Sequence, residues 1–167
     1  MRQSIMDDLW ADEEEDEDTL KDRYLTFHLG GEDYGIEIRH VTEIIGIQKI
    51  TDIPDLPDFI KGVINLRGQV IPTLDLRLRF GLPAKDYNER TCVIITRMND
   101  VPVGVIVDTV NEVVSIPLEQ IAPPPTVQKG LAHRFIEGLG RVGDSVKIIL
   151  NAEKLLHDDE LELLENQ

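Results

Sequence analysis

The sequence predicts a mainly β protein: two small five-stranded barrels packed together, with short helices and a C-terminal helix. Three observations support this prediction: apolar residues that alternate with polar ones, short glycine-containing turns between these runs, and an internal repeat. The 167 residues suffice for one domain or for two small units that share a core. Because 41 % of the residues are hydrophobic and only 5 % are aromatic, we expect an aliphatic core.

Residues 1–21 are predicted to form a disordered acidic tail. The run DEEEDED at residues 12–18 is a block of like charge that repels itself and cannot be buried. It contains seven of the acidic residues of a chain whose net charge is −15, so the remainder is only moderately acidic. The preceding run IMDDLW, residues 5–10, leaves open a second possibility: a short amphipathic docking peptide that includes Trp10.

The first folded segment is predicted to be a β-hairpin. Residues 23–29 and 34–38 alternate in polarity, and the turn residues GGED lie between them. His28 falls on the face opposite the leucines and is expected at the surface. Residues 39–45 lose this alternation, and the i, i+3, i+4 spacing of their apolar residues predicts one or two helical turns that end at Gly46.

A second hairpin is predicted within residues 59–75, after an extended run at residues 47–53 and a proline-containing loop. Its two apolar runs are separated by Arg67, Gly68 and Gln69. A guanidinium at such a tip lies either in water or on a carboxylate of this chain or another. Residues 76–80 are predicted to form a short helix, and residues 85–90 a polar connector between two subdomains.

The second part of the chain is predicted to contain further strands. Candidates are residues 91–97, 103–107, 110–116, 135–139 and 146–150, with a proline-rich loop at residues 117–130. The single cysteine, Cys92, lies in an apolar run and is expected in the core. Residues 153–164 have a partly apolar face and predict the C-terminal helix.

The two parts of the chain resemble each other. Tyr34–Ile45 aligns with Val103–Val114 at an offset of 69 residues, with glycine, valine and glutamate at matching places. Phe59–Gly62 aligns with Phe135–Gly138 at an offset of 76. A duplicated unit of about 65 residues with five short strands buries little as an open sheet, and closure into a barrel removes its edges. Coincidence between valine-rich strands is the alternative.

Composition and motifs argue against several functions. A strongly acidic chain is an improbable partner for nucleic acid, since a phosphate backbone needs a basic face. The N-terminal residues have no apolar signal-peptide core and no run is long enough to insert directly into a membrane, so a cytoplasmic protein is expected. No phosphate loop, metal motif or nucleophile motif is present, which predicts no enzyme activity, no metal and no cofactor. An enzyme on a barrel scaffold remains an alternative to a binding module.

Several runs together resemble the CheW family of bacterial chemotaxis coupling proteins. They are YLTFHLGGEDYGIEIRHVTEII, FIKGVINLRGQVIPTLDLR, VGVIVDTVNEVVSI, GLG and KIILNAEKLL. The combination of NLRG with the following IPTLDLR is specific to CheW-like domains, and the resemblance extends from Tyr24 to Leu156. The acidic tail is longer than is expected for the family.

The resemblance implies a fold and a division of the chain. The fold is two SH3-like five-stranded barrels within a CheW-like domain at residues 22–156. The first barrel is expected at about residues 22–84 and the second at about residues 91–150, followed by a C-terminal helix and tail at residues 151–167.

The resemblance also implies partners. The protein is expected to be a non-enzymatic adaptor that couples methyl-accepting chemotaxis receptors, through their cytoplasmic helical tip, to the regulatory domain of the histidine kinase CheA. It would then be recruited to receptor arrays at the inner membrane. The alternative is a coupling protein of a non-motility chemosensory pathway, such as pilus or second-messenger control.

Eight residues are candidates for partner binding by the same resemblance. Glu43 and Arg67 match functional positions of the family, and their opposite charges are expected to pair across the first barrel. The others are expected to lie around the same surface or to form the apolar wall of a groove between the barrels: Val41, Gly62 and Leu66 for the surface, and Val93, Val110 and Val113 for the wall. Ordinary core packing is the alternative for each valine.

Overall fold

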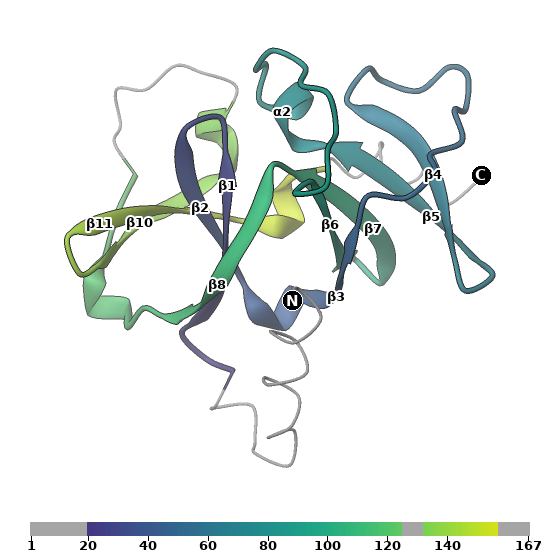
Figure 1. Cartoon of the computed structure of the whole chain (residues 1–167). Helices are drawn as coiled ribbons and strands as arrows, with labels where there is room; N and C mark the ends of the chain where they lie inside the picture. The colour runs from purple at the N-terminus through teal and green to yellow at the C-terminus, as the bar shows by residue number, and fades with distance from the viewer. Residues whose placement is uncertain (1–19, 125–131, 157–167) are drawn as a thin grey trace.

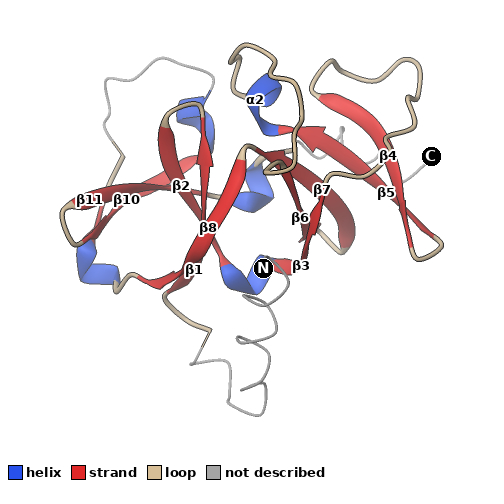
Figure 2. Cartoon of the chain, in the orientation of Figure 1, coloured by secondary structure: helices blue, strands red, loops and turns tan. Residues whose placement is uncertain are grey.

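The computed structural model describes residues 20–124 and 132–156. Figure 2 shows that most of this chain is strand, with short helices at the connections. The strands are β1 (Arg23–Leu29), β2 (Glu32–Glu37), β3 (Val41–Gly46), β4 (Ile60–Leu66), β5 (Gln69–Asp75), β6 (Cys92–Met98), β7 (Val101–Val107), β8 (Thr109–Ser115), β9 (Ile121–Ala122), β10 (Ile136–Val142) and β11 (Ser145–Leu150). The helices are α2 (Leu76–Arg79) and four 3-10 turns at Ile38–His40, Leu118–Gln120, Ala132–Phe135 and Ala152–Lys154.

The strands form two sheets that lie side by side (Figure 1). The first sheet has the order β8-β1-β2-β11-β10-β9 and the second the order β3-β6-β7-β5-β4. We call them the β1 barrel and the β6 barrel. Neighbouring strands are antiparallel except for β2 with β11 and β5 with β7, which are parallel. The predicted mainly β fold with two barrels is confirmed, and the two-residue strand β9 is an addition to the predicted five strands of the β1 barrel.

Each barrel encloses an apolar interior of its own. The β1 barrel buries Tyr24, Ile116 and Ile149, whereas the β6 barrel has a separate cluster of five buried residues: Ile64, Ile71, Val93, Ile95 and Ile106. Because side chains of a strand alternate between its two faces, the other face of these strands points out of the barrel. In the central strands that face is also apolar.

The outward faces of the two barrels meet in a shared core. Leu25 and Phe27 of β1 and Ile94 of β6 belong to one buried cluster that draws on both sheets. Cys92 is part of it and is fully buried, as predicted. The predicted open apolar groove between the barrels is therefore filled by packed side chains in the described part of the chain.

The internal repeat is visible in the topology. β1 to β5 correspond in order to β6, β7, β8, β10 and β11. When each strand of one sheet is replaced by its equivalent in the other repeat, the order of that sheet becomes the order of the other sheet. The parallel pairing Gly35↔Ile149 in one sheet matches Gly104↔Thr73 in the other, at the same offsets of 69 and 76 residues. The bulges also correspond: β3 has a bulge where it pairs with β6, and its equivalent β8 has a bulge where it pairs with β1.

The sequence predicted that one barrel ends at about residue 84 and the other begins at about residue 91. The structure does not divide the chain in this way. The β1 barrel contains β1 and β2 from the first repeat and β8, β10 and β11 from the second, whereas the β6 barrel has the converse composition. Figure 1 shows β8 running from the β6 barrel across to β1. Each barrel therefore needs strands from both repeats, and the alignment of repeats alone does not reveal this exchange.

Three predicted elements differ from the structure. Residues 39–45 form the end of a 3-10 turn and strand β3, which pairs with β6, instead of a longer helical segment. Residues 47–53 contribute only one isolated bridge, Thr51↔Val63, because the loop prolines follow directly. The C-terminal segment has a 3-10 turn at Ala152–Lys154, and residues 157–167 of the predicted helix lie outside the described residues, as do residues 1–19 of the predicted tail.

Candidate partner-binding site

The turn between β4 and β5 presents Arg67 in an unusual backbone conformation. Arg67 and Gly68 have φ values of 52° and 87°, the pattern of a two-residue hairpin turn with both central residues left-handed. Such a φ is uncommon for a residue that has a side chain. The turn is held by the Gly68 N–H, which donates to Asn65 Oδ1 at 2.9 Å.

Arg67 makes a two-pronged ion pair with Glu43, as predicted. Its Nη1 donates to Oε2 at 3.0 Å and its Nη2 to Oε1 at 2.5 Å. This hydrogen-bonded carboxylate raises the pKa of Arg67 further above its ordinary value. Glu43 lies on β3 and Arg67 follows β4, the two edge strands of the second sheet, so the pair bridges the edges and shows how the sheet curls into a barrel.

The pair lies at an open hollow of about 200 Å³. We call it the Arg67 hollow, and its lining includes Thr42, Glu43, Leu66, Arg67, Gln69 and Arg97. The Arg67 side chain is 70 % exposed, whereas that of Glu43 is 19 % exposed. The hollow therefore offers a fixed carboxylate below an accessible guanidinium, with apolar Leu66 beside them.

The other predicted site residues occupy different environments. Leu66 is half-buried in the hollow, but Val41 is buried in the shared core. Gly62 is buried on β4, where its φ of 143° brings the backbone against Thr51.

The predicted apolar wall is not an open surface. Val93 is fully buried inside the β6 barrel, so its side chain packs the interior and cannot line a groove. Val110 and Val113 lie on β8 of the other sheet, where they are partly buried against the shared core. They are the repeat equivalents of Val41 and Ile44, which pack into the same core.

Arg97 is a residue of the hollow that the sequence argument missed. It is exposed near the end of β6, and its Nη1 donates to the Asp100 carbonyl at 3.3 Å. The sequence offered one signal, since Arg97 is the one charged residue in the otherwise mostly apolar run CVIITRM. Its proximity to Arg67 follows from the pairing of β3 with β6 and from the Glu43–Arg67 contact across the sheet edges, and the sequence did not predict the β3–β6 pairing.

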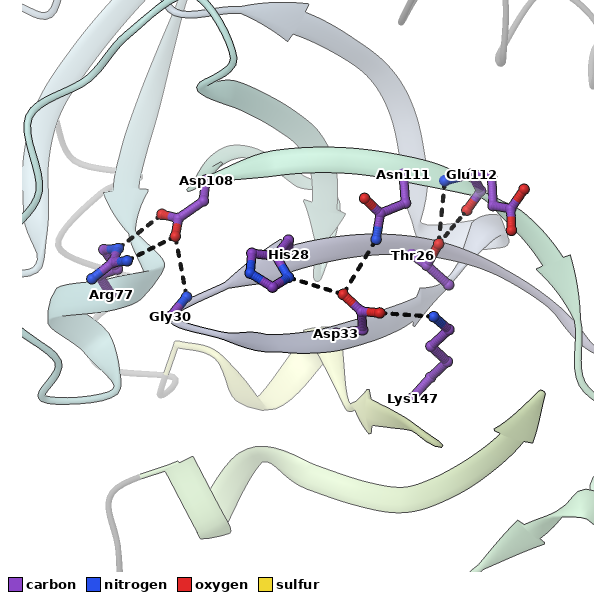
Figure 3. Close-up of polar contacts among 9 residues, drawn as sticks. All are labelled: Thr26, His28, Gly30, Asp33, Arg77, Asp108, Asn111, Glu112 and Lys147. Atoms are coloured by element: carbon purple, nitrogen blue, oxygen red, sulfur yellow. Dashed lines mark hydrogen bonds and ion pairs between the residues drawn. The ribbon is translucent and has the colours of Figure 1, made fainter. Parts of the chain in front are cut away.

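Two further polar clusters tie elements together (Figure 3). Asp108 accepts two hydrogen bonds from Arg77, both at 2.8 Å, and one from the Gly30 N–H at 3.1 Å. Asp33 contacts Lys147 at 2.9 Å and His28 Nδ1 at 3.0 Å. The contacts with His28 and Lys147 lower the pKa of Asp33. Both clusters join strands or turns to each other, which is a structural role.

The described residues contain no group of three or more histidine, cysteine, aspartate or glutamate side chains placed to hold a metal ion. Within residues 20–124 and 132–156, no helix has the length and apolar character needed to cross a membrane. The Arg67 hollow presents an exposed guanidinium in a fixed geometry beside Glu43 and Leu66, a chemistry that suits docking.

Comparison with known proteins agrees with this architecture. The CheW-like domain family model matches residues 23–160. A chemotaxis protein CheW from Klebsiella aerogenes is 42 % identical over 149 residues, covering 89 % of this chain and 90 % of that protein. A chemotaxis protein CheW from Treponema pallidum is 34 % identical and covers 85 % and 86 % of the two chains.

A solved structure extends the likeness to three dimensions. The scaffolding protein TtCheW from Thermoanaerobacter tengcongensis superposes with a TM-score of 0.76 at 36 % identity, covering 83 % of this chain and 94 % of that one. The match includes both barrels, because it spans nearly all of a protein whose fold is two SH3-like barrels. The chain therefore belongs to the CheW family, and it is a non-enzymatic adaptor of chemotaxis signalling.

Proposed function

We propose that this chain couples methyl-accepting chemotaxis receptors to the histidine kinase CheA, and that the Arg67 hollow is one of its docking surfaces. The observation that carries the site is the exposed Arg67–Glu43 pair. Arginine held in a fixed orientation loses little conformational entropy when it binds, and such residues often dominate interface energies. The cytoplasmic helical tip of a receptor and the regulatory domain of CheA are the two proposed partners.

The proposed location follows from this function. A protein that bridges receptors and kinase would work at receptor arrays on the cytoplasmic side of the inner membrane. The relatives named for chemotaxis do not favour a non-motility pathway for this chain.

The roles of the eight site residues divide into two groups under this proposal. Glu43, Leu66 and Arg67 contact the partner from the hollow. The others act by supporting the fold around it or at the opposite barrel: Val41, Gly62, Val93, Val110 and Val113.

The test is calorimetric titration of the full chain with the isolated receptor tip and, separately, with the regulatory domain of the same organism's CheA. Arg67→Ala should weaken binding to at least one of them by about tenfold, since an interface arginine is often a hot spot. Its thermal unfolding should stay close to that of the wild type, because the side chain is exposed.

The matched control is Arg39→Ala, which removes another exposed arginine that is paired with a carboxylate, Glu37, at 2.7 Å. It should bind both partners normally. The exchange variant with Glu43→Arg and Arg67→Glu should recover less binding than the wild type if the partner reads the guanidinium itself. Normal binding of Arg67→Ala to both partners would refute the site, and no binding by the wild-type chain would refute the proposed coupling.

A further inference from the structure

The Arg67 hollow is locally positive on an acidic molecule. Two arginines, Arg67 and Arg97, line it, and Glu43 is the one carboxylate among its described lining residues. Both arginine side chains are exposed, so an anionic group can approach them from solvent. This charge is unusual for a chain whose net charge is −15.

The surface where the described chain begins has the opposite character. Leu20, Lys21 and Asp22 line a second open hollow of about 950 Å³, which we call the entry hollow. It also contains further acidic residues on other elements: Glu37, Glu119 and Glu137. Its basic residues Lys21 and Arg39 are outnumbered by the four carboxylates, and Arg39 is already paired with Glu37.

The electrostatics of the entry hollow agree with this description. Burial raises the pKa of Tyr24, and the negative charges of Glu37, Glu137 and Asp22 raise it further. The run DEEEDED at residues 12–18, which we call the acidic segment, ends two residues before Leu20. Because like charges repel at short range, the entry hollow is an unfavourable position for the acidic segment.

Strand β3 leads from one hollow to the other. Arg39 and His40 line the entry hollow, and Thr42 and Glu43 line the Arg67 hollow. Glu43 follows His40 by three positions of nearly extended chain, a distance of about 10 Å. Residues 12–19 span up to about 27 Å when extended, which exceeds the separation of the two hollows along this stretch.

We propose that the acidic segment docks on the Arg67 hollow of its own chain and competes there with the protein partner. Several carboxylates facing Arg67 and Arg97 supply the attraction, and the short tether gives a local concentration on the order of millimolar. The docking depends only on this chain, whereas the competition rests on the proposed function. The result is an electrostatic brake on partner binding that weakens as ionic strength rises.

The docking is tested on the full chain with a spin label attached through Ala11→Cys. Cys92 is buried, so the introduced thiol is the accessible one. In low salt, the label should broaden the amide signals of Gly68 and Arg97 more than that of Gly143. Gly143 lies at the equivalent turn of the β1 barrel and serves as an internal control.

Two changes should remove this broadening. One is 1 M salt, where the screening length is about 3 Å. The other is replacement of all seven carboxylates of the acidic segment by their amides. Equal broadening at Gly68 and Gly143, or broadening that survives both changes, would overturn the docking.

The competition is tested by calorimetry with the receptor tip and the CheA regulatory domain. The amide-substituted tail should tighten binding about threefold at low salt, as expected when a weak intramolecular competitor is removed. The matched control replaces acidic residues at the other end of the chain by amides: Asp158, Asp159, Glu160, Glu162 and Glu165. It should leave binding unchanged.

Unchanged or weaker binding after substitution of the acidic segment would overturn the competition. If neither the wild type nor the variant binds either partner, the proposed function fails, and the spin-label experiment still decides the docking.

Discussion

Gly62 lies at a bulge of β4 where a side chain has no room. A Cβ added there would come within 2.1 Å of the Thr51 carbonyl oxygen, and its φ of 143° is a conformation that side-chain-bearing residues avoid. Thr51 and Val63 also exchange two backbone hydrogen bonds, at 2.8 and 2.9 Å, beside this glycine. The role of Gly62 is thus to let the loop before β4 lie against the strand.

Gly62→Ala should lower the free energy of unfolding by about 2–4 kcal/mol, because it adds a backbone clash to the conformational strain. The control is Gly31→Ala in the β1–β2 turn, where φ is 92° but nothing lies within 4 Å of an added Cβ. It should cost only about 1 kcal/mol. Urea unfolding of both variants measures the difference, and equal losses would show that contact with Thr51 is unimportant.

At the residue scale, the sequence predicted the pair but not the surroundings of the site. Opposite charges at Glu43 and Arg67 were expected to meet, and they do. Val93 was expected on a groove wall but is buried, since a valine in an apolar strand has the same pattern whether its face points into a barrel or outward. Arg97 was missed because its neighbours come from strands far away in the chain.

At the element scale, α2 is fastened to the other barrel by a largely buried ion pair. Arg77 of α2 and Asp108 at the β7–β8 junction have side chains only 16 % and 11 % exposed. Asp108 also accepts the N–H of Gly30 in the β1–β2 turn. The Asp108 carboxylate thus joins the β7–β8 junction to α2, which follows β5 of the β6 barrel, and to the β1–β2 turn of the β1 barrel (Figure 3).

Asp108→Asn should lower the free energy of unfolding by about 2–3 kcal/mol at pH 7, because it leaves Arg77 without its charge partner. Glu37→Gln, which breaks the exposed pair with Arg39, should cost less than about 0.5 kcal/mol. Chemical denaturation compares the two. A loss for Asp108→Asn as small as that of the control would contradict a fastening role.

The effect of Asp108 should also depend on pH. Burial alone would raise the pKa of Asp108, but the hydrogen bonds from Arg77 and Gly30 outweigh it and lower the pKa below its ordinary value. A lowered pKa in the folded state means that the carboxylate stabilises the fold above the unfolded value of about 3.9. The difference between wild type and Asp108→Asn should therefore shrink as the pH falls below about 4.

Most strands were predictable from alternation, and β3 shows why the remainder were not. Val41, Ile44 and Ile45 have helical spacing in the sequence, but a bulge between Val41 and Glu43 adds one residue to the strand. Val41 and Ile44 consequently face the same shared core although they are three residues apart. A bulge mimics helical periodicity, and only the pairing with β6 reveals it.

At the scale of the whole molecule, the duplication was predictable but the exchange of strands was not. Alignment of repeats identifies equivalent strands, and the equivalences hold throughout both sheets. The alignment does not show whether a strand pairs within its own repeat or with the other repeat. That depends on the crossovers after β2 and after β7, where the chain passes from one barrel to the other. The predicted boundary at residues 84–91 therefore separates the repeats but not the barrels.

This exchange predicts that the repeats cannot fold separately. A fragment of residues 1–86 retains β1 to β5, which are two strands of one barrel and three of the other, and loses β6 and β7, which lie between β3 and β5. It would expose the shared core and unpaired strand edges, so it should be unfolded or aggregated alone, as should residues 87–167. Mixed in equal amounts, the two fragments should regain the circular dichroism and dispersed amide spectrum of the intact chain.

The matched control is the intact chain cleaved between residues 86 and 87 after folding, which should keep its spectrum because residues 82–91 form no strand and all sheet pairings remain. If either fragment folds alone to a cooperative, monomeric state, its strands must pair in a manner different from that in the intact chain. A single repeat would then be able to form a closed barrel by itself. If complementation succeeds and neither fragment folds alone, the shared core and the exchanged strands make the two barrels one folding unit, and damage to either barrel should unfold both.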